Sequence, residues 1–239
     1  LDNSATTKPC KACVDAVHKM LTESWGNPSS LHALGVGSAK EIILARTAVA
    51  QSLGAEKEEI IFTSGGTEAN NLALFGAVKA KKRLGNRIVT TAIEHESVLQ
   101  SAQELEKQGF EVIYLQPDKY GFITEEQIKE AVNDKTILVS IMYVNNEVGS
   151  VMPVEKIRRI VTRAGSPALI HIDCVQAYGK MPIHVKKLGV DLATVSAHKI
   201  HGPKGVGALY VSKAANLTNQ NFAGSFGGEQ EHKIRPGTE

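Results

Sequence analysis

Short apolar runs alternate with longer amphipathic stretches along most of the chain. Seven runs rich in β-branched and apolar residues predict strands at residues 59–63, 87–91, 111–115, 136–141, 168–172, 191–195 and 207–211. Several are apolar at successive positions, which is typical of strands covered on both faces. The stretches between them, at residues 67–84, 97–108, 124–132 and 154–164, have a helical pattern. This alternation predicts an α/β fold with a mostly parallel central sheet flanked by helices.

The two ends of the chain differ from this alternation. Two helical patterns, at residues 9–24 and 38–53, precede the first strand, and a loop rich in Gly, Asn, Pro and Ser joins them. Residues 214–239 are rich in Gly and Asn and lack periodicity, so we expect a surface or interface loop there. The chain begins without Met and stops abruptly at Glu239, so we expect it to be a piece of a longer protein.

Composition narrows the class of protein. The 239 residues are 42% hydrophobic and 22% charged with a net charge of +2, as in an ordinary globular protein, so we expect no nucleic-acid partner. We also expect no membrane association, because no apolar run is long enough to span a bilayer. Three cysteines fit a reducing, cytoplasmic location. The pair Cys10 and Cys13 opens a helical pattern and has no partner motif, so we expect no metal site.

Polar clusters follow the ends of five predicted strands. They lie at residues 64–68, 94–97, 143–149, 173–176 and 196–199. In an open parallel sheet, ligands bind beyond the carboxyl ends of the strands, and these ends meet at one edge. The five clusters therefore predict one shared site.

Two of these clusters suggest a phosphate and a positively charged ring. Gly66 and Thr67 lie between a strand and a helix, where backbone N–H groups bind anions, although an ordinary helix cap is an equal alternative. Asp173 ends an apolar run and needs a cationic partner. The protonated ring nitrogen of pyridoxal phosphate is one candidate partner, and a simple capping role is the alternative.

A third cluster contains an unusual lysine. Lys199 lies between His198 and His201 and precedes several glycines, a setting that suits a neutral amine able to attack a carbonyl. Ser196 and His198 can donate hydrogen bonds to a phosphate. The alternative is an exposed loop lysine, which is our interpretation of Lys204.

One further candidate is a histidine. His95 follows the second predicted strand and can cover one face of a flat ring or move protons, although a structural role is more common for a single histidine.

Together the motifs resemble the class V aminotransferase family of fold-type I pyridoxal phosphate enzymes, and within it the cysteine desulfurases of the NifS/IscS type. The matching stretches are LDNSATT (1–7), GNPSSLH (26–32), FTSGGTEANNLAL (62–74), EHESVL (94–99), VSIMYVNNEVG (139–149), HIDCVQAYGK (171–180), SAHKIHGPKGVGALYV (196–211) and RPGTE (235–239). They occur in order along the whole chain, so the resemblance is specific.

The resemblance implies a role for each of ten residues. Lys199 is similar to the lysine that bonds to the cofactor aldehyde, Asp173 to the partner of the ring nitrogen, and His95 to the stacking histidine. Gln176 resembles the donor to the phenolic oxygen of the ring, and Asn146 the asparagine near that oxygen and the substrate carboxylate. The residues that resemble phosphate ligands are Gly66, Thr67, Ser196, His198 and, for the other subunit of a homodimer, Thr238.

The resemblance also implies a function. It is the conversion of L-cysteine to L-alanine, with the sulfur passed on as a protein persulfide to an acceptor or iron–sulfur scaffold protein. The nucleophilic cysteine and the arginine for the substrate carboxylate lie beyond residue 239 in this family. Residues 1–239 would then be the large pyridoxal phosphate domain, without the small C-terminal domain and not competent alone.

Other functions stay open from the sequence. One alternative is another class V enzyme, either a selenocysteine lyase or an aminotransferase, and another is an inactive truncated cofactor-binding or dimerisation domain. A nucleotide-binding domain is disfavoured because both GxGxxG and the P-loop motif are missing.

Overall fold

A seven-stranded sheet organises the molecule. The computed structural model describes residues 2–215, 217, 230–231 and 235–236. The strand order is β1-β7-β6-β5-β4-β2-β3, and neighbours run parallel except on either side of β7. The strands are β1 Ile60–Thr63, β2 Arg87–Thr91, β3 Glu111–Leu115, β4 Thr136–Met142, β5 Leu169–Asp173, β6 Leu192–Ser196 and β7 Gly207–Val211. The predicted mostly parallel α/β sheet is therefore confirmed.

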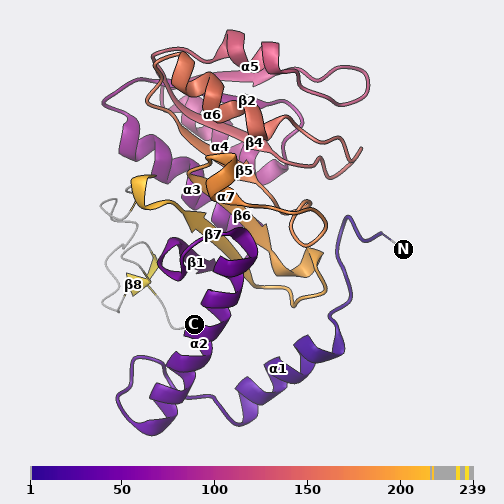
Figure 1. Ribbon diagram of the computed structural model, residues 1–239, viewed down its shortest axis with the longest axis vertical. Coiled ribbons are helices and arrows are strands. Elements are labelled where there is room, and N and C mark those ends of the chain that lie inside the picture. The colour runs from indigo at the N-terminus through magenta and orange to yellow at the C-terminus, as the bar shows by residue number, and fades with distance from the viewer. Residues whose placement is uncertain (1, 216, 218–229, 232–234, 237–239) are drawn as a thin grey trace.

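Helices cover both faces of this sheet (Figure 1). The helices are α1 Lys11–Thr22, α2 Ala33–Leu53, α3 Gly66–Lys81, α4 Glu96–Lys107, α5 Glu125–Ala131, α6 Val154–Arg163 and α7 Val185–Leu188, with short 3-10 turns at Lys57–Glu59, Ala197–Lys199 and Lys213–Ala215. None of the helices in the described part of the chain has the length and apolar character to cross a bilayer.

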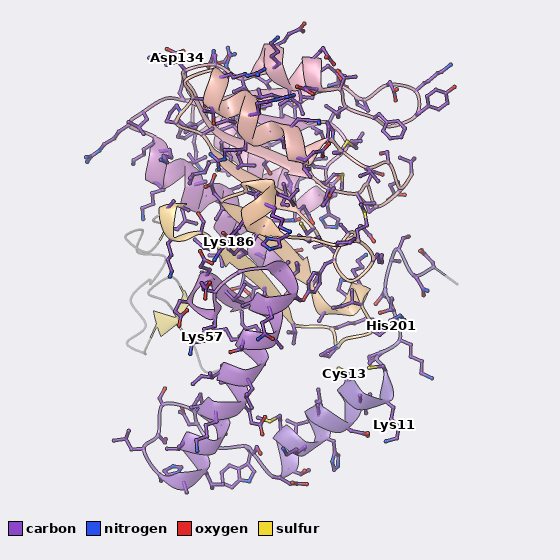
Figure 2. The ribbon with its side chains drawn as sticks, in the orientation of Figure 1. Lys11, Cys13, Lys57, Asp134, Lys186 and His201 are labelled. Carbon is purple, nitrogen blue, oxygen red and sulfur yellow. The ribbon has the colours of Figure 1, made fainter. Side chains whose placement is uncertain are left out.

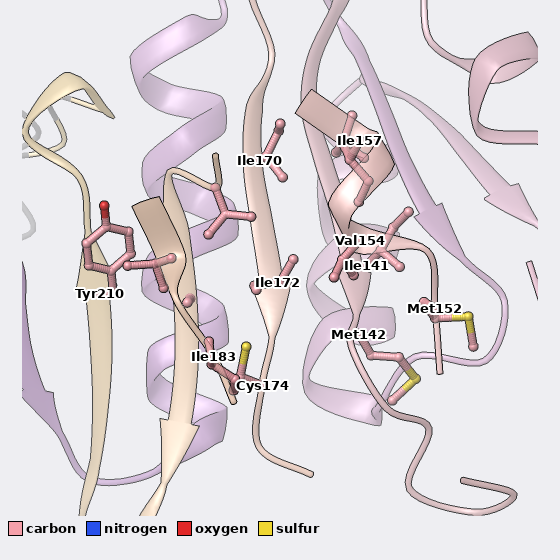
Figure 3. Close-up of a cluster of buried hydrophobic side chains, with 14 of the residues drawn as sticks. Ile141, Met142, Met152, Val154, Ile157, Ile170, Ile172, Cys174, Ile183 and Tyr210 are labelled. Carbon is pink, nitrogen blue, oxygen red and sulfur yellow. The ribbon is translucent and has the colours of Figure 1, made fainter. Parts of the chain in front are cut away.

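Alternating side chains of the strands build two separate cores. Leu138, Leu169 and Leu192 face α3 and α4, whose buried alanines and leucines fill that side. The residues one position along the strands, such as Ile170 and Ile172, lie on the opposite face with α6 (Figure 3). The C-terminal half of α2 contributes Ala50 and Leu53 to the same core. Because both faces are covered, the central strands are mostly apolar at successive positions, as their sequence indicates.

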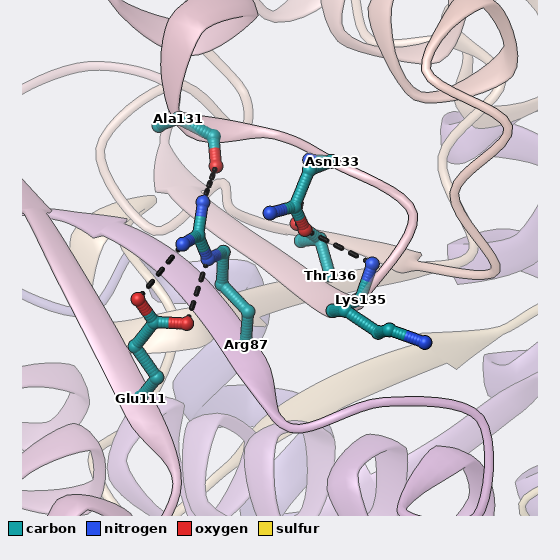
Figure 4. A network of polar contacts seen from close by, with 6 residues as sticks. All are labelled: Arg87, Glu111, Ala131, Asn133, Lys135 and Thr136. Carbon is teal, nitrogen blue, oxygen red and sulfur yellow. Dashed lines mark hydrogen bonds and ion pairs between the residues drawn. The ribbon is translucent and has the colours of Figure 1, made fainter.

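An ion pair fastens the outer edge of the sheet. Arg87 on β2 makes two hydrogen bonds of 2.8 Å to the Glu111 carboxylate on β3, and its Nη1 donates to the carbonyl of Ala131 at the end of α5, at 3.1 Å (Figure 4). Hydrogen bonding from Arg87 lowers the pKa of Glu111. The planar guanidinium can satisfy all three acceptors at once, so it joins three elements at this edge.

Helix α1 and the N-terminal half of α2 extend away from the layered body (Figure 1). α1 has no buried residue, and its Val14, Val17 and Leu21 are exposed. α2 begins at Ala33, five residues before the predicted start, because the Nδ1 atom of His32 accepts a hydrogen bond from the Gly35 N–H and caps the helix. Histidine is not among the common caps, so the sequence pattern misses this start.

The remaining differences from the expected elements are short. The four-residue α7 is too brief to show a helical period. The stretch expected to be irregular contains β8 Gln230–Glu231 and β9 Arg235–Pro236, which pair antiparallel. Two-residue strands leave no alternation in the sequence, so neither could be predicted.

Candidate active site

The polar clusters meet in one cavity at the carboxyl ends of β1, β2, β4, β5 and β6. Its volume is about 200 Å³, and nine of the ten predicted site residues line it. These nine are Gly66, Thr67, His95, Asn146, Asp173, Gln176, Ser196, His198 and Lys199. The tenth, Thr238, lies outside the described residues. The structure therefore brings every candidate that it describes to one cavity, while the role of each residue stays a prediction.

Lys199 is half-buried on the 3-10 turn that follows β6. Its Nζ atom donates hydrogen bonds to the carbonyls of Ser4 and Ala5, the second at 2.9 Å. Burial lowers the pKa of Lys199, the cation of Lys180 lowers it further, and Asp2 and Asp173 oppose this. The amine is thus biased toward its neutral form, as expected, but the cause differs: burial and Lys180 replace the two neighbouring histidines. Lys204 is exposed and does not line the cavity.

An N-terminal segment, residues 4–10, holds the loop that carries Lys199. Thr7 donates to the His198 carbonyl through both its N–H and its hydroxyl, at 2.8 Å each, and its hydroxyl accepts from the His201 N–H at 2.7 Å. The Cys10 N–H donates to the His201 carbonyl at 2.9 Å, which places His201 beside the start of α1 (Figure 2). His201 has a left-handed φ of 63°, an unusual conformation for a residue with a side chain. These hydrogen bonds from Thr7 and Cys10, which we call the N-terminal clamp, therefore hold a strained loop next to Lys199.

We expect Thr7→Val to weaken this clamp. Valine keeps the shape of the buried Thr7 side chain but removes both hydrogen bonds of its hydroxyl, so the free energy of unfolding should fall by about 1–3 kcal/mol. Chemical denaturation followed by circular dichroism measures the change. Thr22→Val, at the exposed end of α1, is the control and should change stability by less than about 0.5 kcal/mol. Equal stabilities of the two variants would contradict the clamp.

Asp173 is the last residue of β5, and its carboxylate is buried at 6% exposure. Oδ1 accepts from the Val175 N–H at 2.9 Å, and Oδ2 accepts from the side-chain amide of Asn70 at 2.8 Å. Burial raises the pKa of Asp173, while these hydrogen bonds and the charges of His95 and Lys199 oppose the rise. A cation placed in the cavity would favour the ionised form further.

His95 caps the start of α4, at the end of the loop that follows β2. Its Nδ1 atom accepts from the Ser97 N–H at 3.1 Å and lies 2.9 Å from the Ser97 hydroxyl. Ser97 in turn accepts from the side-chain amide of Asn70 at 2.9 Å. Neither Asn70 nor Ser97 was predicted from the sequence to be a site residue. Asn70 lies three residues after Thr67, one helical turn away, and that spacing is the signal that could have found it.

Donors for an anion gather at the N-terminus of α3. Gly66 begins this 16-residue helix, and a side chain at this position would press against Val175, whose Cγ2 atom would lie 3.0 Å from the added Cβ. The hydroxyl of Ser196 is buried on the cavity wall and has no hydrogen-bond partner among the residues that the structure describes. His198 shares a 3.2 Å contact with the Thr6 hydroxyl, and burial and the nearby lysine charges lower its pKa. The N–H groups in the first turn of a helix, together with this hydroxyl, favour a bound anion.

Gln176 and Asn146 complete the wall of the cavity. Gln176 donates from Nε2 to the Ser4 carbonyl at 2.9 Å, and its Oε1 atom accepts from Lys180 at 3.0 Å. The half-buried Asn146 donates to the Glu147 carboxylate at 2.8 Å. Both side chains therefore reach the cavity from loops that follow parallel strands.

None of the three cysteines lines the cavity. Cys10 is exposed and Cys13 is half-buried, both at the start of α1. Cys174 follows Asp173 directly, so its side chain points to the opposite face of the sheet, where it is fully buried in the core (Figure 3). Burial and the neighbouring Asp173 charge raise the pKa of this thiol. Cys174 is therefore packed in the core and does not line the cavity.

Comparison with known proteins identifies the family. The model of the family "Aminotransferase class-V" matches residues 1–235. The chain belongs to the class V aminotransferase family. It is 47% identical over its whole length to the putative cysteine desulfurase IscS 1 of Bacillus subtilis, and 46% identical to the cysteine desulfurase IscS of Methanosarcina thermophila. It spans 62% and 58% of the lengths of these two relatives.

Solved structures of this family share the fold. A NifS-like protein matches the whole chain with a TM-score of 0.93 at 39% identity, and the chain covers 64% of that protein. A structure described as SspA in complex with cysteine matches with a TM-score of 0.89 at 36% identity, with 67% of that protein covered. The relation to the NifS/IscS branch of the class V family, inferred above from motifs, is confirmed.

Proposed function

We propose that this class V chain is the large, cofactor-binding domain of a pyridoxal phosphate-dependent cysteine desulfurase. The enzyme would convert L-cysteine to L-alanine and pass the sulfur on as a protein persulfide. The observation that carries the proposal is the meeting of an amine, a buried carboxylate and an imidazole around one cavity, from Lys199, Asp173 and His95. The cysteine desulfurase names of relatives that match the full length of this chain support it.

The chemistry of the cavity fits pyridoxal phosphate. The unpaired Ser196 hydroxyl and the N-terminus of α3 suit a phosphate. Thr67 and His198 line the same wall and add donors. Asp173 is the carboxylate that a protonated ring nitrogen requires, since a buried cation must be paired. Each part of the cofactor thus has a chemical counterpart among these residues.

The roles of the remaining residues follow from their contacts. When bound, the cofactor accepts electrons from a bond to the substrate α-carbon. Lys199 would supply the amine for the cofactor aldehyde and, once released, remove the α-proton, a step that the lowered pKa of its amine favours. His95 would cover one face of the ring. Gln176 and Asn146 would donate to the phenolic oxygen and the substrate carboxylate.

The sulfur acceptor needs a thiolate that can reach the substrate. Cys174 lies behind the sheet with a raised pKa, and a raised pKa suppresses the nucleophilic thiolate form. Cys10 and Cys13 lie at the start of α1 and do not line the cavity. We therefore assign the nucleophile to the part of the protein beyond residue 239, so that residues 1–239 alone are not competent.

The partners and the location belong to the same proposal. Exposed apolar side chains along α1 and α2, including Val17, Leu21 and Leu44, support an interface in a homodimer. Thr238 would contact the phosphate of the other subunit. A second protein, an acceptor or an iron–sulfur scaffold, would receive the sulfur. The three free cysteines support a reducing, cytoplasmic location.

An alanine assay tests this function. We expect the full-length protein, supplied with pyridoxal phosphate, to release alanine from L-cysteine and to form one persulfide per alanine in a single turnover. Residues 1–239 alone should release no alanine above the rate of the free cofactor. Turnover of L-selenocysteine without turnover of L-cysteine, or amino transfer to a keto acid, would overturn the assignment.

A further inference from the structure

A chain of buried hydrogen bonds joins the two groups that would contact opposite parts of the cofactor ring. The side-chain amide of Asn70, at 1% exposure, donates to the Asp173 carboxylate at 2.8 Å and to the Ser97 hydroxyl at 2.9 Å. The Ser97 hydroxyl lies 2.9 Å from His95 Nδ1. Four side chains from α3, β5 and the start of α4 therefore form one connected set.

The direction of each hydrogen bond follows from the groups involved. An amide nitrogen carries two hydrogens, and Asn70 uses both, one on Asp173 and one on Ser97. Ser97 then has its own hydroxyl hydrogen free to donate to His95 Nδ1, which also accepts the Ser97 N–H. Nδ1 is thus an acceptor, and the proton of neutral His95 lies on Nε2.

We propose that Asn70 and Ser97 are positioning residues that couple Asp173 to His95 and set the tautomer of His95. This inference deepens the proposed function and rests on it for the meaning of the two ends. The chain holds the carboxylate that would face the ring nitrogen and the imidazole that would cover the ring in one fixed relation. It also directs the N–H of His95 Nε2 away from Ser97.

The tautomer can be tested without any cofactor. Diethyl pyrocarbonate acylates the unprotonated nitrogen of a neutral imidazole, and in His95 that nitrogen is occupied by Ser97. His201 is the internal reference, because its Nδ1 faces the Lys8 carbonyl at 3.2 Å and must donate to it, which leaves Nε2 unprotonated. Both histidines are exposed. Mass spectrometry of peptides gives the acylation rate of each histidine in the full-length protein at pH 8.

We expect His95 to be acylated more slowly than His201, and Ser97→Ala to raise the rate at His95 about 5-fold through loss of one hydrogen bond. Ser97→Thr, which keeps the hydroxyl, should restore the slow rate. Ser101→Ala is the matched control, since Ser101 is a buried serine one turn along α4 that bonds to the Ser97 carbonyl and to Asn71. An unchanged rate in Ser97→Ala, or the same increase in Ser101→Ala, would overturn the role of Ser97.

Asn70→Ala tests the coupling between the two ends. Asn70 does not contact His95, so an increased acylation rate at His95 in this variant requires transmission through Ser97. We also expect the dissociation constant for pyridoxal phosphate to rise about 10-fold, because a buried carboxylate oxygen loses its donor. A thermal melt identifies any loss of folding, and Ser97→Ala remains informative in that case.

The outcomes separate this inference from the proposed function. If the wild-type protein binds no pyridoxal phosphate, the proposed function fails, while the acylation rates still report on the hydrogen-bond chain. If the cofactor binds but the rate at His95 in Asn70→Ala equals that of the wild type, the coupling is wrong and the proposed function stands.

Discussion

Replacing Lys199 with alanine is expected to lower alanine release from L-cysteine by at least about 10³-fold, because the variant lacks the base for the α-proton. In the full-length protein, the variant should also lose the covalent attachment of pyridoxal phosphate that borohydride reduction makes permanent. Peptide mass mapping locates the attachment, and in the wild type we expect it on Lys199.

Lys204→Ala is the matched control for this experiment. Lys204 lies five residues further along the same glycine-rich loop but is exposed and outside the cavity. Its replacement removes the same charge from the loop and should leave both the activity and the attachment site unchanged. Cofactor mass on Lys204, or full activity in Lys199→Ala, would contradict the assignment of Lys199.

Much of the fold follows from patterns that the sequence displays openly. Strands such as Thr136–Met142 are buried along their whole length, so their apolar runs stand out from the flanking amphipathic helices. The helix start at Ala33 could not be predicted in the same way, since it depends on a histidine cap whose geometry exists only after folding. Prediction therefore succeeds where burial is continuous along an element and fails where one side chain decides a boundary.

The site was predictable to the extent that its residues lie at strand ends. Parallel strands bring their carboxyl ends to one edge, so Asp173 and Lys199 could be placed together from their positions alone. The N-terminal carbonyls of Ser4 and Ala5, which hold the Lys199 amine, come from far along the chain and use backbone atoms that leave no signature. Cys174 points into the core because side chains alternate between the two faces of a strand. This placement depends on Asp173 being the last residue of β5, whereas the sequence pattern ended the strand at residue 172.

The second large effect that we expect is a pH dependence of stability that comes from Glu94. Its carboxylate is buried, and its Oε1 atom accepts from the Met142 N–H at 2.9 Å and from the Thr91 hydroxyl at 2.8 Å. Its Oε2 atom has no hydrogen-bond partner within the described part of the chain. Burial raises the pKa of Glu94 to about 8, the two hydrogen bonds oppose this, and the charge of Asp173 adds to the rise. Glu94 is therefore protonated in the folded protein near neutral pH.

The raised pKa makes the stability of the protein depend on pH in a defined direction. Between the unfolded value of 4.5 and the folded value of about 8, the folded state binds a proton that the unfolded state has released. The contribution of Glu94 is thus fully present below pH 4.5 and is lost as the pH rises through 8. Glutamine carries no titrating proton, so Glu94→Gln removes this dependence.

We expect the difference in the free energy of unfolding, Glu94→Gln minus wild type, to increase by on the order of 3 kcal/mol between pH 5 and pH 9. Denaturant titrations at several pH values measure the difference, in which the other titrating groups cancel. Glu96→Gln, two residues away and exposed, is the control and should show almost no change across the same range. A difference between Glu94→Gln and the wild type that stays constant with pH would mean that Glu94 is ionised in the folded protein, because only a shifted pKa produces a slope.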